Sequence, residues 1–209
     1  MKYLLILSCL LFTSVGWSKD VSYDDLEVRE ELYYEKFTDV PYTGDVVDQG
    51  TGKISNGKKE GEWITYWDNG QLESKGNFKD GKVEVEYISY HHNGQLEFKG
   101  NYKEGKKDGE HLWYYENGQL RRKYNYKDDE LEGEFLGYYK NGQLQYKDNY
   151  KDGKVEGEQI EYYENGQLKI KGNCKDGKRE GEELYYFENG QFEKTKIFKD
   201  DKLIKIIKY

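Results

Sequence analysis

Apolar and polar residues alternate along most of this chain, which is the pattern of a β-strand. The stretch from Leu96 to Tyr102 reads Leu-Glu-Phe-Lys-Gly-Asn-Tyr, with an apolar residue or glycine at every second position. Strand side chains point alternately to the two faces of a sheet, whereas an amphipathic helix repeats its apolar residues about every 3.6 positions. The pattern therefore predicts strands rather than helices.

The same sequence motif recurs every 24 residues. Asn-Gly-Gln begins at Asn69, Asn93, Asn117, Asn141, Asn165 and Asn189. Asp-Gly or a close variant begins 11 residues later, at Asp80, Glu104, Asp128, Asp152, Asp176 and Asp200. A fixed period indicates a repeat architecture, and both dipeptides favour two-residue type I′ turns, which need a positive φ at both residues. The predicted fold is all-β: an elongated single antiparallel sheet of stacked β-hairpins.

The two turns also predict which residues face each other across the strands. An Asn69-Gly70 tip places Trp63 opposite Gly76 and Gly61 opposite Phe78, and the same count recurs in later units, as for Tyr87 opposite Gly100. An aromatic ring above a strand glycine covers bare backbone and helps to hold the register. An Asp80-Gly81 tip would place Ser74 opposite Tyr87 without changing the faces.

The predicted register divides the side chains between two faces. One face is expected to carry Trp63, Trp67, Leu72 and Phe78 with their repeats, and we expect Trp67 to lie opposite Leu72. The other is expected to carry Ile64, Tyr66, Glu73 and Lys75. A single layer of this kind is held together by rows of similar residues in successive repeats.

The composition indicates an ordered, acidic protein. Aromatic residues make up 16% of the chain and alanine is absent, which favours strands over both helix and disorder. Charged residues make up 35%, with a net charge of −8. Nucleic-acid binding requires a basic stripe, so nucleic acid is not an expected partner.

Residues 1–18 are predicted to be a signal peptide. Lys2 precedes an apolar run at residues 3–12 that is too short to span a bilayer, and Gly16 and Ser18 suit cleavage after Ser18. The expected location is outside the cytoplasm: periplasmic, cell-surface or secreted. An uncleaved anchor and a lipoprotein lipidated at Cys9 are the alternatives. Cleavage would leave Cys174 as the one cysteine, so no internal disulfide is expected.

The rest of the chain is expected to form three further regions. These are an N-terminal cap with a degenerate first repeat at residues 19–62, the hairpin repeats at residues 63–198, and a C-terminal capping strand at residues 199–209. Terminal units of repeat proteins differ from the others because they close the open ends of the array.

The repeat unit resembles the MORN repeat in its bacterial variant form. The resemblance rests on Tyr-Tyr-Glu-Asn-Gly-Gln-Leu at residues 162–168, then Gly172-Asn173, then Asp-Gly-Lys-Arg-Glu-Gly-Glu at residues 176–182. Val85 and Asp129 depart from it, since each replaces a glycine. The resemblance implies stacked hairpins and a role in binding proteins or membrane surfaces. Some relatives are classed as YwqK-type antitoxin modules.

Residues of catalytic type offer no convincing site. The three histidines are His91, His92 and His111. His91 and His111 fall where other units carry aromatic residues, so neither a catalytic histidine nor a metal site is expected, and no cofactor. Cys174 stands in the row of Phe78 and is expected to be a small buried residue. The recurring acids, such as Glu86, are expected to pair with lysines on neighbouring strands.

The aromatic face is the candidate binding surface, because a single layer cannot bury both of its faces. The residues chosen for partner binding are Tyr87, His91, His111, Trp113 and Tyr115. The predicted function is an exported, non-enzymatic scaffold that binds a protein or a cell surface. The alternatives are an antitoxin-like module and a membrane- or cell-wall-associated module, although the net negative charge disfavours docking on anionic lipid.

Overall fold

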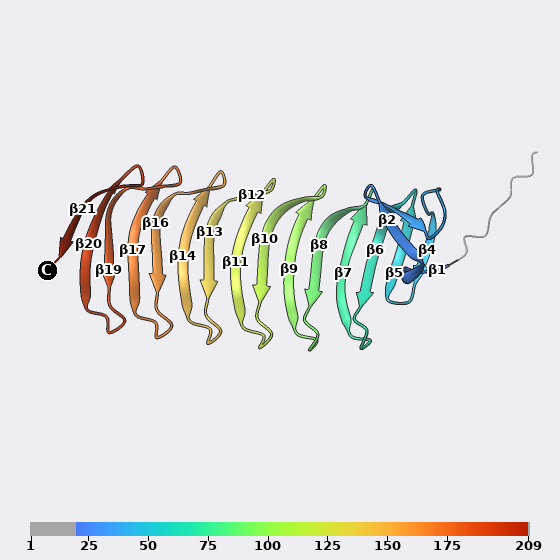
Figure 1. Cartoon of the computed structure of the whole chain (residues 1–209), viewed down its shortest axis with the longest axis horizontal. Coiled ribbons are helices and arrows are strands. Elements are labelled where there is room, and N and C mark those ends of the chain that lie inside the picture. The colour runs from blue at the N-terminus through green and yellow to red at the C-terminus, as the bar shows by residue number, and fades with distance from the viewer. Residues whose placement is uncertain (1–19, 209) are drawn as a thin grey trace, which may run out of the picture.

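The computed structural model describes residues 20–208, so the predicted signal peptide lies outside the described residues. Nineteen strands form one long sheet, and β2 and β3 form a separate two-stranded sheet. Figure 1 shows the strands of the long sheet side by side in chain order, from the N-terminal segment at one end to β21 at the other. The predicted all-β fold of stacked antiparallel hairpins is confirmed. A parallel pair of β1 and β4 is the exception.

The elements of the N-terminal part are β1 (Val21–Ser22), the 3₁₀ turn η1 (Tyr23–Asp25), β2 (Leu26–Arg29), β3 (Leu32–Glu35), β4 (Gly44–Val47), β5 (Gly50–Ser55) and β6 (Lys58–Tyr66). The middle strands are β7 (Leu72–Lys79), β8 (Lys82–Tyr90), β9 (Leu96–Lys103), β10 (Lys106–Tyr114), β11 (Leu120–Lys127), β12 (Glu130–Leu131), β13 (Gly133–Tyr138) and β14 (Leu144–Lys151). The last strands are β15 (Lys154–Val155), β16 (Gly157–Tyr162), β17 (Leu168–Lys175), β18 (Lys178–Arg179), β19 (Gly181–Tyr186), β20 (Phe192–Lys199) and β21 (Lys202–Lys208).

The two turns of each unit differ in type. At Asp80-Gly81 both residues have a positive φ, 51° and 79°, as the prediction of a type I′ turn requires. At Asn69-Gly70 only the glycine does, with a φ of 80°, and the Gly70 N–H donates to the carbonyl of Trp67. The prediction of a two-residue turn is therefore wrong at Asn-Gly, where the loop has a third residue, Asp68. A three-residue loop of this kind ends in a left-handed glycine.

The asparagine of each Asn-Gly turn recurs because of its side chain. Its Oδ1 accepts a hydrogen bond from the backbone two residues on, as Asn93 does from the Gln95 N–H at 3.0 Å. Its Nδ2 reaches the next repeat, where Asn93 donates to the Glu116 carbonyl at 2.7 Å. Asn117, Asn141 and Asn165 make the same bond at 2.8–3.0 Å. These bonds tie successive hairpins together at one edge of the stack.

A β-bulge follows each Asp-Gly turn and changes the predicted register. Phe78 pairs with Val83 as the turn requires, but the pairing then shifts by two residues, and Tyr87 lies opposite Gly76 rather than Ser74. The first position of the bulge has a positive φ, 69° at Gly61 and 68° at Val85. Because a shift of two keeps the parity of a strand, the prediction that the faces do not change holds here.

The predicted pairs of aromatic residues with glycines are present, but the glycines serve two different purposes. A Cβ built on Gly76 would lie 2.8 Å from Cδ2 of Tyr87, so this glycine leaves room for a ring. Gly61 does pair with Phe78, yet a Cβ there would meet no atom within 4 Å. Its glycine is explained by the positive φ of the bulge instead. A ring therefore does lie over Gly76, but it is that of Tyr87 rather than that of Trp63, the predicted one, and no ring covers Gly61.

A second irregularity lies beside the three-residue loop and moves two predicted residues to other faces. Thr65 pairs with Ser74 but Tyr66 pairs with Leu72, so the leucine lies with Tyr66 rather than with the tryptophans. Trp67 is accordingly not opposite Leu72. The position of Glu73 also lies on the aromatic face, because its equivalent Glu97 accepts a hydrogen bond from Ser89, which pairs with Ser74.

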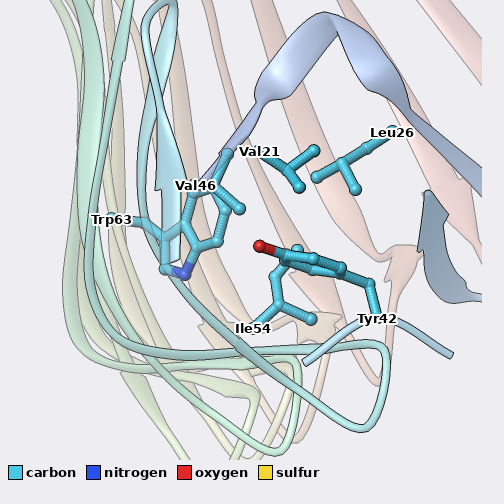
Figure 2. Packing of buried hydrophobic residues seen from close by; sticks show 6 residues of the cluster. All are labelled: Val21, Leu26, Tyr42, Val46, Ile54 and Trp63. Carbon is cyan, nitrogen blue, oxygen red and sulfur yellow. The ribbon is translucent and has the colours of Figure 1, made fainter. Parts of the chain in front are cut away.

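The one cluster of buried apolar side chains lies at the N-terminal end of the described chain. Residues 21–42, which we call the covering segment, cross the aromatic face of the first strands, and Figure 1 shows β2 running obliquely to them. The cluster consists of Val21, Leu26, Tyr42, Val46, Ile54 and Trp63. Figure 2 shows these side chains converging between the covering segment and the curved sheet. Within residues 20–208 no helix is long and apolar enough to cross a membrane.

Candidate binding surface

The aromatic face is hollowed over β8 to β11, beyond the covering segment. This hollow, which we call the aromatic groove, has a volume of about 440 Å³. Its rings are those of Tyr87, Phe98, Tyr102, His111, Trp113 and Tyr124, and Trp67, Glu73, Ser74, Ser89, Glu97 and Lys107 complete its wall. These residues come from five adjacent strands, β7 to β11, and from the loop that holds Trp67, because side chains that pair across neighbouring strands share one face.

The rings of the aromatic groove hold one another in place. The Phe98 ring centroid lies 4.5 Å from that of Trp113 and 5.4 Å from that of His111. Phe98 is buried, with 6% of its surface exposed, whereas Tyr87 and Trp113 are half-buried. A partner that docks here would therefore meet rings that are already ordered, so it loses less conformational entropy on binding.

His111 supports the groove from beneath. Its side chain is only 1% exposed, and Nε2 lies 2.9 Å from the carbonyl oxygen of Asn101. Burial lowers the pKa of His111 below its ordinary value; the bond to Asn101 opposes this shift, and the charge of Lys107 adds to it. A neutral ring that donates from Nε2 fits this environment. His111 thus belongs to the predicted site by position but presents little surface to a partner.

The buried histidine predicts that acid will destabilise the fold. Because its folded-state pKa is lowered, the unfolded chain binds the proton more readily, and stability falls as the pH drops below about 6.5. The other titratable side chains near the ring are those of Tyr102, Tyr124 and Tyr126. Burial raises the pKa of Tyr102 and that of Tyr124, so neither ionises in this range. His111→Phe should reduce the dependence of the melting temperature on pH between pH 7.5 and pH 5.

The same substitution has a second expected effect. It should cost about 1 kcal/mol at pH 7.5, because the bond to Asn101 is lost. The matched control is His92→Gln, which removes an exposed imidazole stacked on Trp67 and should leave the slope unchanged. Equal slopes of melting temperature against pH for the wild type and His111→Phe would contradict the assignment of this pH dependence to His111.

The other two predicted site residues, His91 and Tyr115, lie beside the groove. Each bonds to a backbone carbonyl one repeat ahead: Tyr115 Oη donates to Tyr138 at 2.8 Å, and His91 Nε2 lies 3.1 Å from the oxygen of Tyr114. Trp67, Tyr139 and Tyr163 make the equivalent bond. His91 and Tyr115 also line a second hollow of about 520 Å³ with Arg121 and Lys140. Their first role is therefore to join repeats.

The aromatic content of this face decreases beyond β13. Asp148, Gln159, Glu161 and Glu183 occupy it there, and Gln159 Nε2 donates to Asp148 at 2.9 Å. Burial raises the pKa of the Asp148 carboxyl, while this hydrogen bond opposes the increase. Cys174 is buried, as predicted, and its thiol donates to Gln159 Oε1. Burial raises the pKa of that thiol, which makes it a poor nucleophile.

The opposite face carries the predicted pairs of acids and lysines. Glu86 lies 2.7 Å from Lys99, and the same ion pair recurs at 2.5–2.6 Å between Glu110 and Lys123, Glu134 and Lys147, and Glu158 and Lys171. The paired groups are partly exposed, so each pair adds little stability. Because the charges on this face neutralise one another, it is a weaker candidate for a binding surface than the aromatic face.

Sequence reasoning did not select three rings of the groove: Phe98, Tyr102 and Tyr124. Each stands on the predicted aromatic face, so the parity of the strands was a sufficient signal for them. Arg121 and Arg122 were also missed. Arg122 pairs with Trp113 across the strands and is exposed. Two adjacent arginines occur nowhere else in this acidic chain, which was the available signal.

Comparison with known families gives one match. The model described as the MORN repeat variant matches six consecutive segments: residues 59–80, 83–104, 107–128, 131–152, 155–176 and 179–200. Comparison with curated proteins finds no match. The matched segments run from β6 to β20 and contain every residue that lines the aromatic groove.

Proposed function

Because the chain belongs to the MORN repeat variant family, we propose that it is a non-enzymatic scaffold that binds a partner protein in its aromatic groove. Repeats of this family are non-catalytic modules that bind proteins or membranes. The observation that carries the proposal is the open cluster of ordered rings over β8 to β11. Tryptophan and tyrosine are the residues that contribute most often to the binding energy of protein interfaces.

A protein partner fits this surface better than a lipid surface does. The chain has a net charge of −8, which opposes approach to anionic lipid. The groove is also a hollow rather than a protruding apolar edge, and a hollow lined by rings can enclose side chains of a partner. Rings make up most of the groove lining, which suits recognition of a partner.

Truncation of a groove ring should weaken partner binding while leaving the fold intact. The partner is recovered by crosslinking to the wild-type chain, identified by mass spectrometry and purified. Trp113→Ala and Tyr87→Ala should each weaken its binding by at least tenfold, since a hot-spot ring contributes about 2 kcal/mol or more. Titration calorimetry gives the affinity, and circular dichroism melting confirms the fold.

The matched control is Tyr90→Ala. Tyr90 lies on the same strand as Tyr87 but pairs with Leu96 on the opposite face, and it is half-buried as well. Its removal should leave the affinity unchanged. Full binding by folded Trp113→Ala, or equal losses for all three variants, would refute the aromatic groove as the binding surface. An identified partner that is a toxin would favour the antitoxin-like alternative.

Export remains part of the proposal. It is motivated by the basic start, the short apolar run and the small residues Gly16 and Ser18. We expect N-terminal sequencing of the protein from its native cell to begin near Lys19, in a fraction outside the inner membrane. Recovery of an intact Met1 solely from the cytosol would refute export.

A further inference from the structure

The covering segment shows what the aromatic face accepts from a polypeptide. Two of its tyrosines lie against Trp63: the Tyr23 ring centroid is 6.3 Å from the indole and that of Tyr33 is 6.5 Å away. Lys59 lies among these rings, with Nζ 4.3 Å from the centroid of Trp63, 5.7 Å from Tyr23 and 5.5 Å from Tyr33. The first unit thus binds tyrosine side chains between a tryptophan and a lysine.

Part of this arrangement recurs two units further on, at the edge of the groove. Lys59, Trp63 and Phe78 correspond, at a spacing of 48 residues, to Lys107, His111 and Tyr126. Lys107 Nζ lies 4.9 Å from the centroid of Tyr126, as Lys59 Nζ lies 5.4 Å from that of Phe78. The covering segment packs on Trp63 and Phe78, whereas the groove is lined by residues of the repeats alone. His111, which takes the position of Trp63, is covered by rings of the repeats themselves, so the surface that stays open to a partner is that of Tyr87 and Trp113.

Charge indicates which segments suit the groove. Residues 20–35, all but the first of which belong to the covering segment, carry seven carboxylates and a single arginine: Asp20, Asp24, Asp25, Glu27, Glu30, Glu31 and Glu35 against Arg29. Lys107 lines the groove, and the exposed Arg122 lies opposite Trp113. Glu73 and Glu97 line the far side, so the positive charge is concentrated towards β10 and β11.

Resting on the function proposed above, we infer that the groove binds an extended, acidic polypeptide segment that carries tyrosines, of the same chemistry as the covering segment. Tyrosine rings of the partner lie against Trp113 and Tyr87, with Lys107 beside them. Carboxylates of the partner pair with Arg122, whose guanidinium can form two parallel hydrogen bonds to a carboxylate. The covering segment packs on Trp63, whose position in the next repeat is that of Tyr87, so the aromatic face accepts such a segment without rearrangement of the sheet.

The test uses a peptide taken from this chain. A fluorescein-labelled peptide of residues 20–35 is titrated with the full-length protein, and fluorescence anisotropy measures binding at 50 mM and 300 mM salt. We expect saturable binding that weakens at high salt, because paired charges are screened. Tyr23→Ser with Tyr33→Ser in the peptide, or Trp113→Ala or Arg122→Glu in the protein, should weaken it at least tenfold. Tyr90→Ala should not.

Each other outcome overturns the inference. Binding that survives Trp113→Ala and Arg122→Glu would mean that the peptide exchanges with the covering segment at Trp63. Because Arg122 is exposed, Arg122→Glu should fold, and it therefore still tests the inference if Trp113→Ala unfolds. If the peptide does not bind even at millimolar protein, while Trp113→Ala still loses the natural partner, the inference is refuted and the proposed function stands. Retention of that partner by folded Trp113→Ala refutes the proposed function itself.

Discussion

Val85→Gly should make the protein more stable, by about 1 kcal/mol. Val85 occupies the first position of the bulge with a φ of 68°, where the other units of the repeat carry a left-handed glycine. A left-handed conformation costs a residue with a Cβ about 1–2 kcal/mol, and glycine avoids this cost. Glycine also loses more conformational entropy than valine on folding, but this loss cancels only part of the gain. The Val85 side chain is 69% exposed, so little packing is lost.

The reciprocal substitution should have the larger effect. Gly157 occupies the same position with a φ of 87°, and a Cβ there would meet no atom within 4 Å. Gly157→Val should therefore lower the free energy of unfolding by about 1–3 kcal/mol through backbone strain alone. Urea unfolding of both variants measures the changes. A stabilised Gly157→Val, or a destabilised Val85→Gly, would show that the bulge does not select for glycine.

The repeat and its strands could be predicted because their causes are local. Turn dipeptides and alternation act within a few residues, and six copies in phase remove most ambiguity. The bulges could not be predicted, since a glycine such as Gly61 has the same appearance whether it makes room for a ring or adopts a positive φ. Leu72 was assigned to the wrong face for a related reason. Asn-Gly occurs in two-residue and three-residue loops, and the extra residue moves the leucine across the sheet.

The candidate site was predicted in part. Tyr87 and Trp113 were placed on the aromatic face by parity, and they line the groove. His111 shares that face, but four neighbouring rings bury it, which depends on packing between strands rather than on parity. The bonds of His91 and Tyr115 to the next repeat depend on how far one hairpin is offset from another. The covering segment has no repeat pattern, and only long-range packing against Trp63 places it.

Gly100→Val should destabilise the sheet by about 1–3 kcal/mol. Gly100 is paired with Tyr87 on one side and with His111 on the other. A Cβ on this residue would collide with the Phe98 ring and would come within 2.9 Å of the His111 imidazole. The sequence predicts that Tyr87 covers Gly100, but Phe98 and His111 are the rings in closest contact with it. Both are buried, so neither can move aside without disturbing Trp113.

The neighbouring position provides the control for this substitution. Lys99 points to the opposite face and pairs with Glu86 across the strands, at 2.7 Å. Lys99→Val removes a partly exposed ion pair that contributes about 0–1 kcal/mol, and valine favours strands, so its net effect should be small. Thermal melting of both variants compares them. Equal decreases in melting temperature for Gly100→Val and Lys99→Val would mean that the rings above Gly100 are loosely packed. In that case the aromatic groove would not be the rigid surface on which its role in binding depends, since loosely packed rings would have to be ordered by the partner.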